Sequence, residues 1–219
     1  MRVIHNMEAD YGETLQLQEE EFDARVDARK RGEELPEDLL IIAQHHPVYT
    51  LGLHADERNL LLPTQTILDR GAGIFRIQRG GDITYHGPGQ LTVYPIVDLQ
   101  RLNLGVKKYV HTLEEAVIRT IAHFNIMGER IEGATGVWID AGLPNERKIS
   151  AIGIRCSRNV AMHGLALNVG SDLSAFSAIN PCGFTDRGVT SISRETGRET
   201  PLEEVIPVLE SHLTALLQP

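Results

Sequence analysis

Cys182 is a residue in this sequence that could carry chemistry. It lies in residues 180–184 (NPCGF), a turn-like segment in which Pro and Gly flank the cysteine. A cysteine in a turn is more often accessible than one inside an apolar strand. A thiol with an ordinary pKa near 8.5 is only a few per cent ionised at neutral pH, so a nucleophile needs a neighbouring cation. The segment alone leaves a structural thiol and a nucleophile equally open.

Lys148 is a candidate for that cation. It begins the largely apolar run 148–154 (KISAIGI). A lysine at the start of a strand is usually a solvated charge, and base rates favour that interpretation here. Partly buried beside a thiol, its ammonium would instead favour the thiolate by Coulomb attraction, and it could also move protons.

The segment 79–90 (RGGDITYHGPGQ) has four glycines in twelve residues. Glycine permits a close approach of backbone N–H groups to a ligand carbonyl or anion. The same composition is also typical of two tight hairpin turns with His86 at the tip, and the two interpretations have equal weight. The spacing matches neither a phosphate-binding loop nor a dinucleotide-binding glycine motif.

The remaining histidines do not predict a metal site. His163 lies in an apolar strand pattern, where a hydrogen-bonded core histidine is the usual finding. His45, His46 and His54 lack a matching set of Cys, Asp or Glu ligands. We therefore expect no metal.

The hydropathy pattern predicts the elements that must position these residues. Asp10 and Glu13 form a capping pair for a helix that ends before Gly32, and apolar residues at helical spacing predict a second helix over 105–124. Thr200 is expected to cap a C-terminal helix in which Pro207 causes a kink or a delay. The expected strands are 2–4, 39–44, 71–79, 90–97, 137–140, 148–156 and 160–169, the last two joined by a turn at 157–159. Strands in local pairs predict an α+β fold, and the length predicts a single domain over 1–219.

Composition argues against nucleic-acid-binding, membrane and secreted classes of protein. The formal net charge of −9 argues against a nucleic-acid partner, and an acidic protein partner would need a local basic patch. No apolar run of 18 residues and no signal-peptide pattern is present, so we expect a cytoplasmic protein without a membrane segment. In that compartment Cys156 and Cys182 are expected to be free thiols.

Four motifs together resemble one family, the octanoyl-acyl-carrier-protein:protein N-octanoyltransferases of lipoate biosynthesis. They are RGGDITYHGPGQLTVYP, KISAIGI, HGLALNV and INPCGF, which occur in the family's order and spacing. The resemblance runs from about Leu39 to Phe184. It implies a biotin/lipoate protein ligase-like α+β fold, with a mixed sheet flanked by helices, and an enzyme without metal or other cofactor.

The resemblance also implies roles for individual residues. Cys182 matches the acyl-thioester nucleophile and Lys148 the lysine that lowers its pKa. The residues that match substrate-binding stretches are Arg79, Gly80, Gly81, Asp82, Ile83, Thr84, Tyr85, His86, Ala151, Ile152, Gly153, Gly164, Leu165 and Ala166. An Asp at position 82 that faced the acyl carbonyl would disturb the charge balance there. As walls of an apolar tunnel for the acyl chain we expect Ile83, Tyr85, Ile152, Leu165 and Leu167.

The family's partners follow from the same resemblance. The donor is octanoyl acyl carrier protein, and the acceptors are lysines of lipoyl domains in 2-oxoacid dehydrogenase complexes and of the glycine cleavage H protein. Either Lys148 or His86 could deprotonate the acceptor lysine. The alternatives are an ATP-dependent lipoate or biotin ligase on the same fold, and a non-catalytic module that binds lipoyl domains or carrier proteins. The cysteine motif argues against the first, and the presence of both Cys182 and Lys148 argues against the second.

Overall fold

The main sheet forms the centre of the molecule. The structure is a computed structural model that describes residues 1–180 and 188–218. Within these ranges the strand order of the main sheet is β1-β2-β6-β10-β9-β8-β7, with β11 pairing β9. The bounds are β1 Arg2–Ala9, β2 Leu39–His45, β6 Gln90–Asp98, β7 Glu129–Ile131, β8 Ala134–Ile139, β9 Arg147–Ser157, β10 Val160–Asn168 and β11 Gly188–Val189. The pairs β1–β2 and β9–β11 are parallel and the others antiparallel, so the sheet is mixed.

A smaller sheet lies beside the main one. Its strands are β3 Val48–Leu51, β4 Gly73–Arg76 and β5 Ile83–His86, in the order β4-β3-β5. Short helical segments border it: η1 Glu57–Asn59, α2 Thr64–Asp69 and η2 Leu173–Ala178. Apolar side chains of β3 and β5, with Ile67 and Phe176, form a separate small core there.

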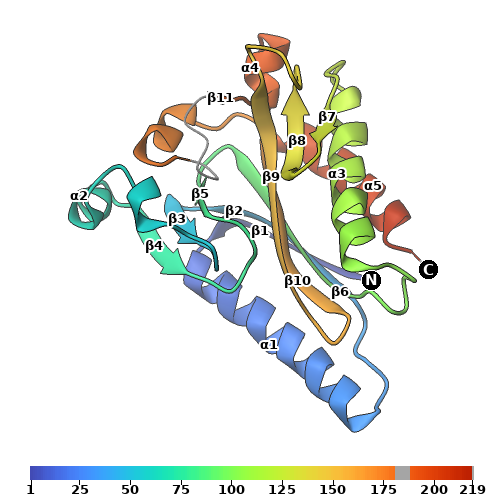
Figure 1. Cartoon of the computed structure of the whole chain (residues 1–219). Coiled ribbons are helices and arrows are strands. Elements are labelled where there is room, and N and C mark those ends of the chain that lie inside the picture. Colours follow the sequence, from blue (N-terminus) through green and yellow to red (C-terminus); the bar gives the residue numbers. More distant parts are fainter. Residues whose placement is uncertain (181–187, 219) are drawn as a thin grey trace.

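Helices cover both faces of the main sheet (Figure 1). α1 Tyr11–Arg31 packs on one face through Phe22 and Val26. α3 Val106–Ala122 and α5 Leu202–Leu216 pack on the other face, and α4 Ile192–Thr196 follows β11. No helix in the described ranges has the length and apolar character needed to cross a bilayer.

Local sequence signals account for most of these boundaries. The Asp10 carboxylate accepts the Glu13 N–H at 2.9 Å, and Gly32 ends α1 in the left-handed region at φ +70°. Arg158 and Asn159 both have positive φ in the tight turn between β9 and β10. The predicted pairing of these two strands is confirmed.

Several boundaries differ from the expectation, and three of them have a clear structural description. β1 extends to Ala9, because its parallel pairing with β2 continues past the short apolar run. β4 is shorter than expected and covers only Gly73–Arg76. Thr200 is not the cap of α5: Pro201 occupies that position without a side-chain cap, and the helix continues through Pro207.

Candidate active site

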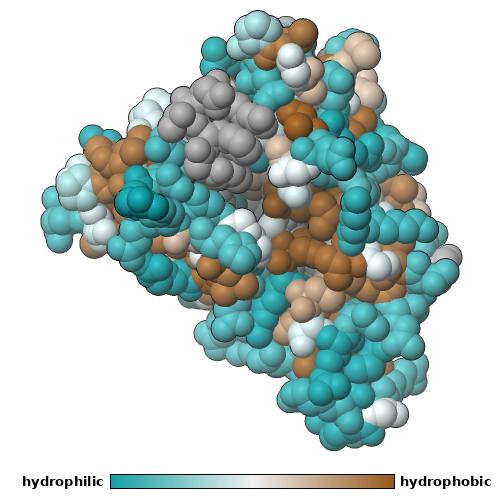
Figure 2. Space-filling view, in the orientation of Figure 1, coloured by the Kyte–Doolittle hydropathy of each residue, from teal (hydrophilic) through white to brown (hydrophobic). Residues whose placement is uncertain are grey.

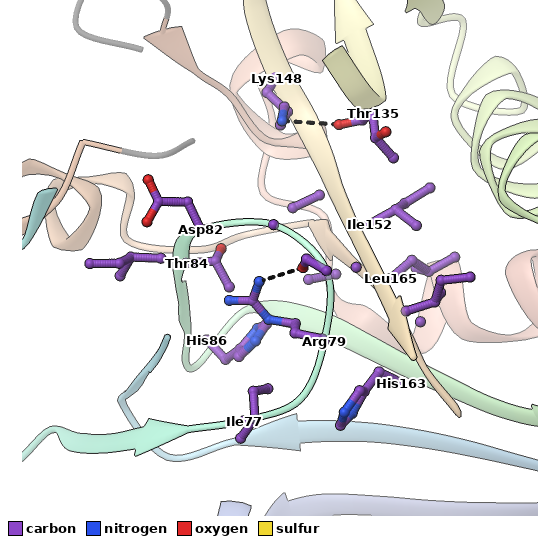
Figure 3. Close-up of a pocket in the computed structure, with 18 of the residues that line it drawn as sticks. Ile77, Arg79, Asp82, Thr84, His86, Thr135, Lys148, Ile152, His163 and Leu165 are labelled. Carbon is purple, nitrogen blue, oxygen red and sulfur yellow. Dashed lines mark hydrogen bonds between the residues drawn. The ribbon is translucent and has the colours of Figure 1, made fainter. Parts of the chain in front are cut away.

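A cavity of about 530 Å³ lies between the two sheets. Loop 79–82 and β5 border one side of it, and β9 and β10 form the other. Apolar side chains gather in the middle of this face of the molecule, with hydrophilic residues around them (Figure 2). Lys148 and Thr135 lie toward one end, and Ile77 and His163 toward the other (Figure 3). The cavity is therefore long, with a cation at one end.

Most of the substrate-binding residues expected from the sequence line this cavity. They are Arg79, Gly80, Gly81, Asp82, Ile83, Thr84, His86, Ala151, Ile152, Gly153, Gly164, Leu165 and Ala166. Segments separated by more than sixty residues thus meet at one site, as the resemblance predicted.

Tyr85 and Leu167 do not line the cavity. Side chains alternate across a strand, so Thr84 and His86 turn to the cavity while Tyr85 turns to the opposite side of β5. There the Tyr85 ring contacts the rings of Tyr49 and Phe176. Leu167 is fully buried in the main core. As walls of the cavity, both were wrong predictions.

Loop 79–82 is fastened directly to β9. The Gly80 N–H donates to the Ile154 carbonyl at 2.9 Å. A Cβ on Gly153 would lie 2.8 Å from the Gly80 carbonyl oxygen, so only glycine permits this approach. Because its N–H is already used, Gly80 is not a free donor for an oxyanion.

Arg79 fixes the loop to the small sheet. Its buried guanidinium donates to the Thr50 carbonyl at 2.7 Å and to Thr50 Oγ1 at 2.9 Å. A third bond at 3.0 Å reaches the Gly80 carbonyl. These contacts give Arg79 a structural role in shaping the loop.

The Asp82 carboxylate is turned away from the cavity walls. It accepts hydrogen bonds from the Asp56 N–H at 3.1 Å and from the Asn59 side-chain amide. Figure 3 shows the carboxylate directed away from Ile152 and Leu165. In this orientation the Asp82 charge does not face the part of the cavity expected to hold an acyl carbonyl.

Lys148 is buried, with only 8% of its surface exposed. Its Nζ donates to the Thr135 carbonyl at 3.1 Å and lies 4.5 Å from the centre of the Trp138 ring. The base-rate expectation of a solvated lysine is wrong here. Its ammonium faces the cavity from β9, where a developing negative charge would be attracted to it.

His86 is held by hydrogen bonds on both ring nitrogens. Gln90 donates its amide to Tyr85 and Asn168, so its Oε1 is left to accept from His86 Nδ1 at 2.7 Å. His86 Nε2 then accepts from Thr50 Oγ1, 3.5 Å away. Burial lowers the pKa of His86 to about 3. His86 also ends strand β5 and does not occupy a hairpin tip.

Two further histidines, His163 and His45, are also buried and hydrogen-bonded. His163 hydrogen-bonds Gln18 Oε1 at 3.2 Å, which confirms the expected core histidine, although it also borders the cavity. His45 lies 2.8 Å from the Tyr94 hydroxyl. Burial lowers the pKa of His163 to about 3 and that of His45 to about 4. The imidazoles are therefore neutral at pH 7.

Cys182 lies outside the described residues, and so does part of the INPCGF motif. The described residues on either side of it make contacts near the cavity. The Asn180 N–H donates to the Asn59 carbonyl at 2.8 Å, and the Asn59 side chain contacts Asp82 at the cavity. On the other side, Val189 of β11 pairs with Lys148 itself. The described residues on both sides of 181–187 thus lie close to the cavity: Asn180 through Asn59 and Asp82, and Val189 as part of the lining.

Cys156, the other cysteine, does not reach the cavity. It is a free, half-buried thiol on β9 that packs against the main core. Burial raises its pKa, which makes it a poorer nucleophile.

Sequence reasoning missed several cavity residues. Val110 falls within the helix expected over 105–124 without any sign that it borders a cavity, and Tyr11 and Phe176 belong to none of the four motifs. For Val110 a weak signal existed, because it lies one turn into α3, where the apolar stripe reaches the helix end. Among the described residues no group of three or more His, Cys, Asp or Glu side chains is arranged to hold a metal ion.

The sequence matches known proteins over nearly its whole length. The model of the lipoyl protein ligase A/B catalytic domain matches residues 10–214. The octanoyltransferase of Bacteroides thetaiotaomicron is 52% identical over 207 residues, which cover 94% of this chain and 91% of the relative. That of Parabacteroides distasonis is 50% identical over 188 residues, with 85% of each chain covered.

Solved structures share the fold at low sequence identity. The bipartite lipoate protein ligase of Thermoplasma acidophilum superposes with a TM-score of 0.69 at 17% identity, covering 99% of this chain and 84% of that one. The apo biotin protein ligase of Aquifex aeolicus gives a TM-score of 0.52 at 13% identity, covering 99% and 68%. These likenesses confirm the expected α+β architecture.

Proposed function

Because the chain belongs to the lipoyl protein ligase A/B catalytic domain family and its similar proteins are octanoyltransferases, we propose that it is an acyltransferase that moves an octanoyl group through Cys182. The donor is octanoyl acyl carrier protein, and the acceptor is a lysine of a lipoyl domain or of the glycine cleavage H protein. The reaction takes place in the cytoplasm, within one domain.

The observation that carries this proposal is a buried cation at one end of a largely apolar cavity. Lys148 supplies the cation, and β11, which follows the cysteine motif, pairs with it. An apolar acyl chain fits the cavity, while its thioester carbonyl fits the charged end.

In the first half-reaction, the Cys182 thiolate attacks the thioester carbonyl carbon of the donor. The Lys148 ammonium attracts the thiolate and the negative charge of the tetrahedral intermediate. The bond from that carbon to the carrier sulfur then breaks, and the carrier thiolate takes a proton from Lys148. The products are acyl-Cys182, a free carrier thiol and a neutral Lys148 amine.

In the second half-reaction, the neutral amine of the acceptor lysine attacks the carbonyl carbon of acyl-Cys182. The bond from that carbon to the Cys182 sulfur breaks, an amide and the Cys182 thiolate form, and the remaining amine proton passes to solvent. A free lysine titrates near 10.4, so its ammonium must lose a proton first. The neutral Lys148 amine can take that proton and return to its starting state. His86 is a weaker candidate, since its ring nitrogens are both hydrogen-bonded and burial lowers its pKa to about 3.

The acyl chain would lie along Ile152 and Leu165 of the main sheet, toward Ile77 and His163. Burying six methylene groups contributes up to about 5 kcal/mol at roughly 0.8 kcal/mol each. Two fewer methylenes would lose about 1.6 kcal/mol, so shorter chains bind only moderately less well. Exclusion of longer chains requires that the cavity end near Ile77 and His163.

The direct test is intact-mass analysis after incubation with octanoyl acyl carrier protein in the absence of ATP. We expect the mass of one octanoyl group on the wild-type chain and on Cys156→Ser. Cys182→Ser should show none, because the serine hydroxyl is not ionised near neutral pH. Acylation that persists in Cys182→Ser and disappears in Cys156→Ser would reject Cys182, and a requirement for ATP would indicate a ligase instead.

A further inference from the structure

A buried carboxylate, that of Glu114 on α3, lies behind the peptide group that binds Lys148. Glu114 has only 4% of its surface exposed. Its Oε1 accepts the Gly136 N–H at 3.1 Å. A buried charge is costly unless it is fully hydrogen-bonded, so a carboxylate at this position needs a structural or functional reason.

One peptide group joins Glu114 to Lys148. The carbonyl of Thr135 and the N–H of Gly136 belong to the same peptide bond. The carbonyl accepts from Lys148 Nζ at 3.1 Å, and the N–H donates to Glu114. Successive hydrogen bonds polarise one another, so a carboxylate at the N–H end makes the carbonyl a better acceptor for the ammonium.

The backbone conformation at Gly136 brings the Thr135–Gly136 peptide close to β9. Gly136 has φ +123°, a conformation that side-chain-bearing residues rarely adopt. A Cβ there would lie 2.4 Å from the Ser150 carbonyl oxygen. The peptide is therefore pressed against β9, and Glu114 holds its N–H from the helix side.

The other carboxylate oxygen is also occupied. Glu114 Oε2 accepts from His111 Nδ1 at 2.9 Å and from Arg130 Nε at 3.1 Å. Arg130 is shared with the neighbouring Glu115, whose Oε2 lies 2.7 Å from Arg130 Nη2. Glu115 therefore takes part in the same ion-pair network, but Gly136 hydrogen-bonds Glu114 and not Glu115.

We propose that Glu114 is a positioning residue for Lys148, acting through the Thr135–Gly136 peptide. It orients that peptide so that its carbonyl holds the Lys148 ammonium at the cavity. The proposal rests on the catalytic role of Lys148 proposed above. It adds a residue in an amphipathic helix that none of the four motifs contains.

The test compares Glu114→Gln, Glu114→Ala and the control Glu115→Gln. The first reading is the rate at which Lys148 reacts with acetic anhydride at fixed pH, measured by peptide mass spectrometry. Removing the Glu114 charge loosens the ammonium, so we expect a rise of several-fold in Glu114→Gln and a larger rise in Glu114→Ala. Glu115→Gln should label at the wild-type rate, because it disturbs Arg130 and leaves the peptide in place.

The second reading is the pH midpoint for alkylation of Cys182 by iodoacetamide. We expect it to move upward by about half a pH unit or more in Glu114→Gln and to stay unchanged in Glu115→Gln. A generally destabilised fold would not shift this midpoint selectively. Glu114→Gln keeps the shape of the side chain, so it provides a folded variant if Glu114→Ala does not fold.

The outcomes separate this inference from the proposed function. Equal Lys148 labelling in folded Glu114→Gln and in the wild type would overturn the positioning role. Full octanoyl transfer by Lys148→Met would instead overturn the catalytic role of Lys148, whatever the labelling shows.

Discussion

At the scale of single residues, Asp82 brings a negative charge to the cavity border without directing it at the cavity. Its carboxylate accepts from the Asp56 N–H and from the Asn59 side chain. Asn59 in turn accepts the Asn180 N–H through its carbonyl. Asp82 thus ties the glycine-rich loop to the segment that leads into the cysteine motif.

Asp82→Ala should weaken this tie and leave the acid–base chemistry intact. We expect a loss of about 1–3 kcal/mol in the free energy of unfolding, because two donors lose a charged acceptor. Octanoyl transfer should slow several-fold, while the pH midpoint for Cys182 alkylation stays at the wild-type value. Urea unfolding and pH-dependent alkylation measure these effects.

Glu57→Ala is a matched control for that change. Its carboxylate pairs with Arg76 at an exposed site, where an ion pair contributes little. An upward or downward shift of the alkylation midpoint in Asp82→Ala alone would mean that the carboxylate acts on the thiol directly.

At the scale of elements, loop 79–82 and the β9–β10 hairpin depend on each other. The Gly80 N–H bonds the Ile154 carbonyl, and Gly153 allows the two backbones to meet. The loop brings Arg79 and the glycines to the cavity, and the hairpin brings Lys148 and the apolar walls. The cavity therefore requires both elements in contact.

Gly153→Ala should separate them. Its Cβ would lie 2.8 Å from the Gly80 carbonyl oxygen, a backbone atom that cannot move aside without moving the loop. We expect kcat/KM for octanoyl transfer to fall at least tenfold, measured with a range of donor concentrations.

Gly170→Ala is the control, since its new Cβ would meet its nearest neighbours at 3.6 Å, an ordinary contact. Gly170 lies outside the loop–hairpin contact, so the activity of Gly170→Ala should match that of the wild type. An unimpaired Gly153→Ala would show that the loop can shift without harm to the cavity.

Local signals and long-range contacts explain how far the sequence could predict this molecule. The cap at Asp10 and the end of α1 at Gly32 depend on neighbouring residues, and both were predicted correctly. The burial of Lys148 was not, because its contacts come from Thr135 and Trp138 on β8. The β8–β9 register shifts between Val137 and Trp138, and no pattern in the sequence signals that irregularity.

The motif resemblance supplied what the local patterns could not. It placed residues of loop 79–82, β9 and β10 at one site, and the structure brings them together. It did not reveal which way each side chain points. Tyr85 therefore appeared as a wall, although strand alternation turns it into the small core.

At the scale of the whole molecule, three neutral histidines lie buried where the two sheets meet. His45 and His86 have ring centres 6.3 Å apart, and His163 also faces this region. Burial lowers the pKa of each, to about 4 for His45 and about 3 for the other two. In the unfolded chain the pKa of each of these histidines returns to its ordinary value of about 6.5.

Stability should therefore fall with acid. Between pH 6.5 and pH 4 the unfolded chain binds more protons than the folded one, so the free energy of unfolding decreases as the pH falls. From pH 7 to pH 5, each such histidine contributes a loss on the order of 1–2 kcal/mol. Urea unfolding at the two pH values measures the total.

His163→Gln should reduce the difference between pH 7 and pH 5 by about one histidine's share. Equal pH dependence in His163→Gln and the wild type would show that His163 is not a source of acid sensitivity.

The register of the β9–β10 hairpin has a consequence for how this cavity can change over evolutionary time. Gly153 faces Gly164, Ile152 faces Leu165 and Ala151 faces Ala166, so residues of similar size stand opposite each other. For the Ile152–Leu165 and Ala151–Ala166 pairs, enlarging one member crowds its partner and shrinking it leaves a void. Variation in the cavity's width should therefore proceed by compensating double substitutions, and the two halves of the hairpin should show epistasis in any library that varies them together.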